Sequence, residues 1–154
     1  MKFFIYLLCF LAINLGGLYL GNILMANEAT SQWYLNLNRA PWTPPGWVFG
    51  LAWTSIMLCF SVYLSFLFQW KSTIGLWLLL GIQTFLNIIW NYVFFNQHMT
   101  LLGLIIIISL FIVILYYFTN FKSDSLKTKR LLLVPYIIWL CIAISLNLYV
   151  VIHN

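Results

Sequence analysis

The chain has 154 residues, of which 64% are hydrophobic and only 6% are charged, and its formal net charge is +5. This composition excludes an ordinary water-soluble domain, in which about a quarter of the residues are charged. It predicts a single integral membrane domain over residues 1–154, which crosses the membrane several times. If the chain is bacterial, that membrane is the cell membrane.

The uncharged runs between the few charged residues set the number of membrane spans. The longest run, 72–121, would form a helix of about 75 Å, whereas a hydrocarbon core is about 30 Å thick. It must therefore turn back, and we expect the turn at the polar cluster of residues 96–100. The sequence thus predicts an all-α bundle of five transmembrane helices, near 4–26, 45–68, 74–95, 101–120 and 132–152.

The first span has a second interpretation as a cleaved signal peptide, because Lys2 precedes an apolar stretch. However, the uncharged run is longer than 20 residues and contains Asn14. It also has Leu24 where a cleavage site would have a small residue. These features favour a helix that is retained in the mature protein.

Positive charge is distributed unevenly over the predicted topology. With five spans, the N-terminus and the second and fourth loops lie on one side and hold six of the seven cations, and Arg39 alone lies on the other. Cytoplasmic loops of membrane proteins carry an excess of Lys and Arg. We therefore expect a cytoplasmic N-terminus and an external C-terminus. The net charge is a topology signal and not a nucleic-acid-binding patch.

The segment 39–53 stands out because it holds three tryptophans and three prolines in fifteen residues. Thr43 is expected to cap the second helix, and Pro44 to occupy its first turn. The tryptophans would then lie at the mouth and on one face of that helix. This arrangement predicts a membrane helix that opens onto an aromatic pocket.

Polar and small residues recur at helical spacing on four of the five predicted spans. Because polar side chains are costly in lipid, such stripes should face the bundle interior. The fourth span has little polar character beyond Ser109 and is expected to be lipid-facing or peripheral. The stripes comprise Asn14, Gly17 and Gly21; Gly46, Gly50, Trp53 and Met57; Gln83, Asn87, Trp90, Asn91 and Phe94; and Tyr136, Trp139, Ala143 and Asn147.

These stripes have a plainer interpretation as well, because glycines also mediate helix packing and a buried asparagine can simply cross-link helices. Tryptophans also anchor helices at membrane interfaces. We expect this anchoring role for the tryptophans near predicted helix ends, which are Trp33, Trp42, Trp70 and Trp77. The three that lie deeper are expected to line a pocket, and these are Trp53, Trp90 and Trp139.

Residues suited to catalysis or metal binding are sparse. The two carboxylates, Glu28 and Asp124, lie in predicted loops, which argues against proton-coupled transport. The two histidines are isolated, so no metal site and no required cofactor are expected. Cys9, Cys59 and Cys141 lie alone in separate apolar spans and are expected to be core residues without disulfides.

Three motifs, in the same order along the chain, resemble those of the TspO/MBR family of tryptophan-rich sensory proteins, which includes the mitochondrial translocator protein or peripheral-type benzodiazepine receptor. Trp33-Tyr34 together with the segment 39–54 resembles the family's first loop and second helix. The segment 86–95 resembles its third helix. The segment 131–139, together with Ala143 and Asn147, resembles its fifth helix.

The resemblance implies a five-helix bundle, commonly a homodimer, that binds porphyrins such as protoporphyrin IX and haem, and in some members sterols or benzodiazepine-type ligands. It carries the family's pocket onto Tyr34, Trp53, Asn87, Trp90, Trp139 and Ala143. Together with the stripes and with Trp42 of the first-loop motif, it gives the ligand-binding residues expected here, which are Tyr34, Trp42, Gly46, Gly50, Trp53, Asn87, Trp90, Phe94, Trp139 and Ala143.

The chain departs from the family pattern at several positions. Ala40 stands where the family often has proline, and residues 97–99 contain no basic residue apart from His98, where the family usually carries a cation. No cation follows Tyr149, which the sterol motif proposed for the fifth helix would need. Sterol binding at that place is therefore not expected.

Three classes of function are compatible with these residues. We favour a binding or sensing protein that holds a tetrapyrrole in an aromatic pocket, with the first loop as a lid. The resemblance also implies an enzyme-like alternative, in which Trp53 or Trp139 takes part in light- and oxygen-dependent porphyrin breakdown. The third class is a passive transporter of porphyrin or sterol.

Overall fold

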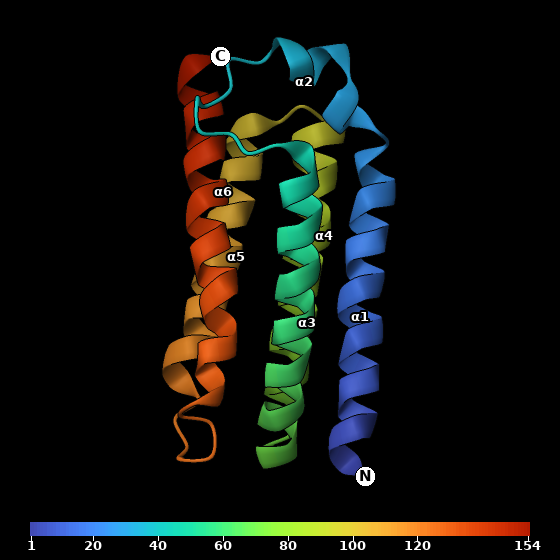
Figure 1. Ribbon diagram of the computed structural model, residues 1–154, viewed down its shortest axis with the longest axis vertical. Coiled ribbons are helices and arrows are strands. Elements are labelled where there is room, and N and C mark those ends of the chain that lie inside the picture. The colour runs from blue at the N-terminus through green and yellow to red at the C-terminus, as the bar shows by residue number, and fades with distance from the viewer.

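Five long helices run side by side and form the body of the molecule (Figure 1). The structure is a computed structural model that describes all residues 1–154, of which 82% are helical and none forms a strand. Each long helix, with its flanking turns, is long and apolar enough to cross a membrane, which confirms the five predicted spans. The helices are α1 (Lys2–Met25), α3 (Gly46–Trp70), α4 (Ile74–Asn91), α5 (Thr100–Asn120) and α6 (Val134–His153).

Four short elements connect the long helices. The first loop contains a 3₁₀ turn η1 (Glu28–Thr30) and a short helix α2 (Gln32–Asn36), and it lies at the end of the bundle that holds the C-terminus (Figure 1). A π turn η2 (Tyr92–Asn96) extends α4, and a 3₁₀ turn η3 (Lys129–Leu133) leads into α6. The predicted boundaries agree with these elements to within a few residues.

Helix α3 begins later than the sequence analysis predicts. Its N-cap is Pro45, in an extended conformation, and Gly46 is its first residue. The expectation that Thr43 caps the helix is wrong, since the Thr43 hydroxyl donates to the carbonyl of Ala40 at 2.7 Å. The cause is the Pro-Pro pair, because a residue that precedes proline is disfavoured in the helical region and Pro44 therefore stays outside the helix.

The core lies in the half of the bundle away from the first loop. Phe60, Tyr63, Leu64 and Leu67 of α3 are fully buried there. Polar bonds between helices add to this apolar packing: the Tyr63 hydroxyl donates to the carbonyl of Tyr117 on α5 at 3.0 Å. The amide of Gln83 on α4 donates to the hydroxyl of Tyr136 on α6, also at 3.0 Å. These bonds satisfy groups that lipid would leave unpaired.

Helix α5 is more buried than expected. The prediction that the fourth span is lipid-facing or peripheral fits its outer face, where Leu101, Ile105 and Ile112 are exposed, but α5 also packs against α6 and α4 and buries its other face. The residues of that face follow helical spacing and are Leu104, Ile107, Leu110, Ile114 and Tyr117. An almost uniformly apolar helix gives no polar mark by which the sequence could distinguish its inner face from its outer face.

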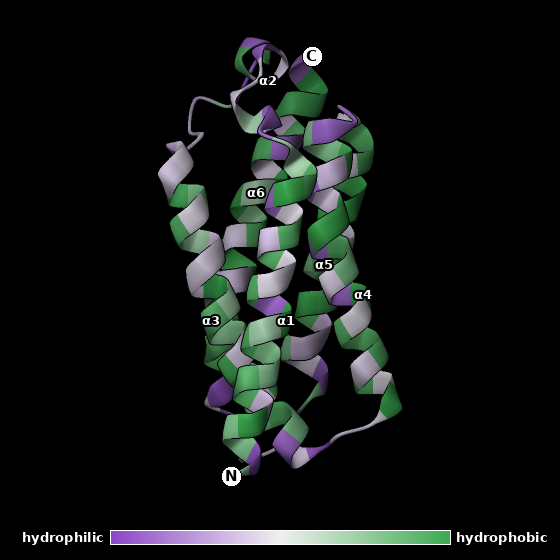
Figure 2. Cartoon of the chain, turned by 90° about the vertical axis from the view of Figure 1, so that its right-hand side faces the viewer, coloured by the Kyte–Doolittle hydropathy of each residue, from purple (hydrophilic) through white to green (hydrophobic).

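The outer surface suits a bilayer. Figure 2 shows hydrophilic residues mostly toward the two ends of the bundle, and large apolar side chains are exposed along its sides. The expectation of three core cysteines is wrong for two of them, because Cys9 and Cys141 are exposed and Cys59 is half-buried. A thiol is apolar enough to face lipid, so an apolar surrounding sequence does not distinguish lipid from core.

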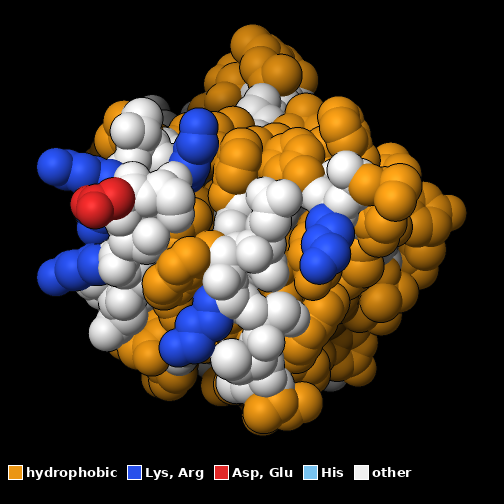
Figure 3. Space-filling view, turned by 90° about the horizontal axis from the view of Figure 1, so that it is seen from below, with side chains coloured by type: hydrophobic (Ala, Val, Ile, Leu, Met, Phe, Trp, Pro, Cys, Tyr) orange, Lys and Arg blue, Asp and Glu red, His pale blue; other side chains and the backbone are white.

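The cations gather at the end of the bundle opposite the first loop. Figure 3 shows this end, where most of the blue side chains gather on one half of the face and the rest of it is largely apolar. Six cations belong to the start of α1, the end of α3 and the loop between α5 and α6, and they are Lys2, Lys71, Lys122, Lys127, Lys129 and Arg130. The prediction that these residues share one side of the bundle agrees with the fold.

Candidate functional site: an aromatic cavity under the first loop

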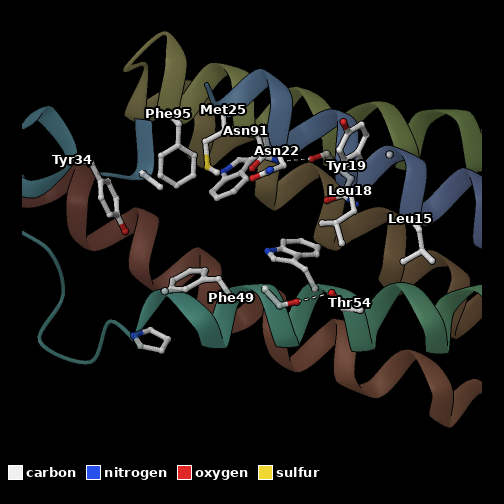
Figure 4. Close-up of a pocket in the computed structure, with 18 of the residues that line it drawn as sticks. Leu15, Leu18, Tyr19, Asn22, Met25, Tyr34, Phe49, Thr54, Asn91 and Phe95 are labelled. Carbon is white, nitrogen blue, oxygen red and sulfur yellow. Dashed lines mark hydrogen bonds between the residues drawn. The ribbon is translucent and has the colours of Figure 1, made fainter. Parts of the chain in front are cut away.

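A cavity of about 650 Å³ lies between α1, α3 and α4 in the half of the bundle near the first loop. Helix α1 faces α3 across it (Figure 4). Tyr34 of α2 stands at the end near the loop, and Leu15 of α1 lies toward the opposite end (Figure 4). Several wall residues are exposed, including Tyr19 and Thr54, so the cavity opens on the flank between α1 and α3. In a membrane that flank faces lipid.

Aromatic side chains from four elements form much of the wall. Trp53 of α3 and Trp90 of α4 are both buried, and Phe49, Phe95 and Tyr34 are half-buried beside them. Trp53 packs edge-on against the buried Tyr136, with ring centroids 5.9 Å apart. The indole N–H of Trp90 has no hydrogen-bond partner in the protein. The wall therefore offers flat apolar faces and one unused donor.

The π turn at the end of α4 brings two consecutive phenylalanines to this region. The amide of Gln97 donates to the carbonyl of Tyr92 at 3.0 Å, which closes a turn wider than that of an α-helix. Phe94 stacks on Trp90 with centroids 5.5 Å apart, and Phe95 meets the same indole edge-on at 5.6 Å. A π turn within a helix is often found at a functional site.

Trp139 and Ala143 line a second, much smaller cavity of about 30 Å³. Phe49 lies between the two cavities and lines both, and its ring meets that of Trp139 edge-on at 5.3 Å. Trp53 also contributes to both cavities. The Trp139 indole N–H has no partner in the protein. Trp139 therefore lines only the small cavity, whose wall it shares with residues such as Phe49 and Trp53 that line both cavities.

Glycines provide space on one wall and close packing on another. A Cβ atom placed at Gly46 or Gly50 of α3 would meet no other atom within 4 Å. A Cβ atom at Gly21 of α1 would instead lie 2.8 Å from the side-chain nitrogen of Asn91. Thus Gly46 and Gly50 leave the cavity wide, whereas Gly21 allows α1 to approach α4 beside it.

Amide side chains supply the polar part of the inner wall. Asn91 donates to the carbonyl of Asn87 at 3.2 Å, and the Asn87 amide points at the sulfur of Met57 at 3.9 Å. A thioether is a weak acceptor, so the Asn87 amide retains capacity for a stronger partner. These groups can orient a ligand whose main contacts are apolar.

The first loop is fastened to the bundle on both sides of the cavity. On one side, the ring of Trp33 stacks on His98 with centroids 3.9 Å apart, and Glu28 lies 3.5 Å from the same imidazole. On the other side, the indole of Trp42 donates to the Ser145 hydroxyl at 3.2 Å. The loop thus covers the end of the cavity and is tied to α6 and to the turn between α4 and α5.

The predicted ligand-binding residues divide into three groups in the structure. Six line the main cavity, namely Tyr34, Gly46, Gly50, Trp53, Asn87 and Trp90. Three line the small cavity without reaching the main one, namely Phe94, Trp139 and Ala143. Trp42 lines neither cavity and is exposed, and its ring packs edge-on against Tyr149 of α6.

The sequence analysis missed most of the wall formed by α1. Leu15, Leu18, Asn22 and Met25 follow helical spacing and line the cavity, together with Tyr19. Asn22 was the available signal, because a polar residue near the end of an apolar span often faces a cavity. Phe49, Thr54, Phe95 and Arg39 were missed as well.

The site has no constellation for metal or acid–base chemistry. No group of three or more His, Cys, Asp or Glu side chains is close enough to hold a metal ion. The wall of the cavity is mainly apolar and aromatic, with amide groups on one side. This arrangement defines the class of a small five-span membrane protein with an aromatic cavity covered by its first loop.

Comparison with known proteins names that class. The chain belongs to the TspO/MBR family, whose model matches residues 8–152. It is 34% identical over 125 residues to the tryptophan-rich protein TspO of Chlorobaculum tepidum, which covers 78% of both chains. It is 29% identical to the TspO of Archaeoglobus fulgidus, over 96% of this chain and 94% of the relative. The tryptophan-rich sensory protein of Cereibacter sphaeroides is 34% identical, over 75% of this chain and 73% of its own.

Proposed function

We propose that this membrane protein binds and senses tetrapyrroles, such as protoporphyrin IX and haem, or similar flat hydrophobic molecules. The observation that carries the proposal is the cavity of about 650 Å³ with Trp53 and Trp90 in its wall. Its volume lies within the range of about 300–1,000 Å³ of ordinary ligand sites. Aromatic walls favour a flat π system by offset stacking and edge-on contact.

The flank between α1 and α3 gives such a ligand a route from the bilayer. A porphyrin partitions into lipid, and the exposed Tyr19 and Thr54 stand beside that route. The lid then closes the end of the cavity at the membrane surface. The protein needs no further cofactor in this account, since the porphyrin is the ligand.

The proposal also covers the orientation of the protein in the membrane and its assembly. We infer that the cationic end faces the cytoplasm, because Lys and Arg are enriched on that side of membranes. The lid and the C-terminus would then lie outside. The homodimer implied by the family remains a prediction, and a chemical cross-linking experiment in native membranes would test it.

The test is a titration of the detergent-purified protein with protoporphyrin IX in the dark, followed by tryptophan fluorescence. We expect saturable quenching, because bound porphyrin lies close to Trp53 and Trp90. Haem should compete for the same site, so that its addition lowers the fluorescence of bound protoporphyrin IX. Quenching that rises without saturation would show partition into detergent and would contradict the proposal.

Two further measurements separate binding from the alternative functions. Illumination of the saturated complex in air should leave the porphyrin absorbance unchanged relative to porphyrin in empty micelles. Protein-dependent loss of absorbance would favour breakdown instead. Porphyrin flux into liposomes that exceeds flux into protein-free liposomes would favour passive transport.

A further inference from the structure

Arg39 is the one charged side chain on the wall of the main cavity. It lies in the first loop, at the same end as Tyr34, and also contributes to the small cavity that contains Trp139. It further lines a depression on the outer surface formed by residues 37–46. Arg39 and Thr43 are therefore common to the walls of all three cavities.

The guanidinium has no acidic partner in the protein. The chain has only two acidic side chains, Glu28 and Asp124, and the one ion pair within 4.0 Å, the C-terminal carboxylate included as a possible partner, joins Glu28 to His98. Asp124 lies in the loop at the opposite end of the bundle. The Arg39 group rests over the ring of Tyr34, 5.1 Å from its centroid. Its planar N–H donors stay available for an acceptor that the protein does not supply.

The backbone around Arg39 is held firmly although the side chain is exposed. On one side, Asn38 and Asn154 are joined by two hydrogen bonds, of 2.8 Å and 3.3 Å. On the other side, Ala40 is buried and Trp42 is fastened to Ser145. This segment therefore holds the backbone of Arg39 at a fixed place beside the cavity, so that only side-chain freedom is lost when the guanidinium binds an anion.

We propose that Arg39 binds a carboxylate of the ligand, so that the cavity selects flat apolar molecules with an acidic group at one edge. This inference rests on the proposed tetrapyrrole-binding function and names its selectivity. The wall residues of α1 span Leu15 to Met25, about 15 Å along the helix, which leaves room for the apolar body below Arg39. The acidic edge then lies at the membrane surface, where water can reach it.

A guanidinium is suited to this role because its two parallel N–H donors match the two oxygens of a carboxylate. Tyr34 supports the group from below, and a ring under a guanidinium is a favourable partner. If the ligand has no acidic group, these N–H donors stay hydrogen-bonded to water and add nothing to the binding affinity. The selectivity therefore depends on the ligand's charge and not on its ring system.

The experiment compares protoporphyrin IX with its dimethyl ester, which has the same ring but no carboxylate, in dark titrations at neutral pH. We expect the acid to bind about tenfold more tightly, as is typical of a charge-assisted hydrogen bond. Arg39→Gln should lower the affinity for the acid to that for the ester and leave the affinity for the ester unchanged. Arg39→Lys should keep part of the preference, since it keeps the charge but loses the paired geometry.

Lys71→Gln is the matched control, because it removes one cation at the opposite end of the bundle. It should leave the preference for the acid intact. The thermal midpoint of each variant in detergent checks that the fold is unchanged. Equal affinity of the acid and the ester in the unaltered chain would overturn this inference alone and leave the proposed function standing. Binding of neither compound would overturn both.

Discussion

Asn14 of α1 donates a 2.9 Å hydrogen bond to the hydroxyl of Ser61 on α3, at the level where the cavity begins. Both side chains are buried, and Leu15, the next residue along α1, is already on the cavity wall. The Ser61 hydroxyl donates in turn to the carbonyl of Met57 at 2.7 Å. This pair holds α1 against α3 below the cavity, while the same two helices face one another across the cavity above it (Figure 4).

Removal of this bond should destabilise the bundle. Ser61→Ala leaves the buried Asn14 amide without its partner, and we expect a loss of about 1–2 kcal/mol of unfolding free energy. The double variant Asn14→Leu/Ser61→Ala should recover part of that loss, because both polar groups are gone. Unfolding in detergent with increasing dodecyl sulfate measures both. If the loss of stability in the double variant equals the sum of the losses in the two single variants, Asn14 and Ser61 are not energetically coupled.

A close contact of α1 with α4 leads to a second prediction. Gly21→Ala places a Cβ atom 2.8 Å from the Asn91 nitrogen, so Asn91 must turn and lose its bond to the carbonyl of Asn87. We expect a loss of about 1 kcal/mol in stability and weaker porphyrin binding. Gly17→Ala is the matched control for stability one turn away, because its Cβ would make an ordinary contact at 3.5 Å. Porphyrin binding is not compared in this control, since Gly17 itself lines the cavity. Equal losses of stability in the two variants would contradict this interpretation of the contact.

The two deep tryptophans should differ in their effect on binding. Trp53 lines both cavities, whereas Trp139 lines only the small one, behind Phe49. Trp53→Phe should therefore weaken protoporphyrin IX binding by about three- to tenfold, the range expected for loss of one aromatic contact. Trp139→Phe should have the smaller effect. Dark titrations of the two variants compare them, and a larger effect at Trp139 would place the ligand nearer α6.

The lid should be held by stacking more than by charge. Trp33 and His98 are stacked at 3.9 Å, whereas the Glu28–His98 pair is partly exposed and such pairs contribute little. We expect Trp33→Ala to speed porphyrin dissociation several-fold, and Glu28→Gln to change it little. Stopped-flow displacement of bound porphyrin by excess haem gives both rates. Unchanged dissociation in Trp33→Ala would mean that this contact does not hold the lid.

The sequence predicted the spans well because charge and length constrain them strongly. Nine charged residues, all outside the predicted hydrocarbon segments, left five apolar stretches of membrane length. The inward faces of α4 and α6 were also predictable, since Gln83, Asn87 and Asn147 mark them and are buried. Polar residues in lipid are informative because their placement is costly.

The cavity itself was only partly predictable. Trp53 and Trp90 were expected on its wall, but no periodicity reveals that Phe49 separates Trp139 from the main space. That separation depends on how far α6 lies from α1, which is a tertiary property. The role of Trp42 was ambiguous for the same reason, because its contact with Ser145 joins segments far apart in the chain. The buried apolar face of α5 was not predictable, because no polar residue distinguishes it in the sequence from the exposed face.

The most direct test of the central claim is to fill the cavity from a position that tolerates a side chain. Gly50→Phe adds a ring where a Cβ meets no atom within 4 Å, and it projects into the cavity. Gly81→Phe is the control, because Gly81 of α4 also has open space but lies outside the cavity. The account predicts that saturable protoporphyrin IX quenching is lost in Gly50→Phe and kept in Gly81→Phe, with both variants folded. Undiminished binding by Gly50→Phe would show that the porphyrin binds elsewhere and would contradict the account.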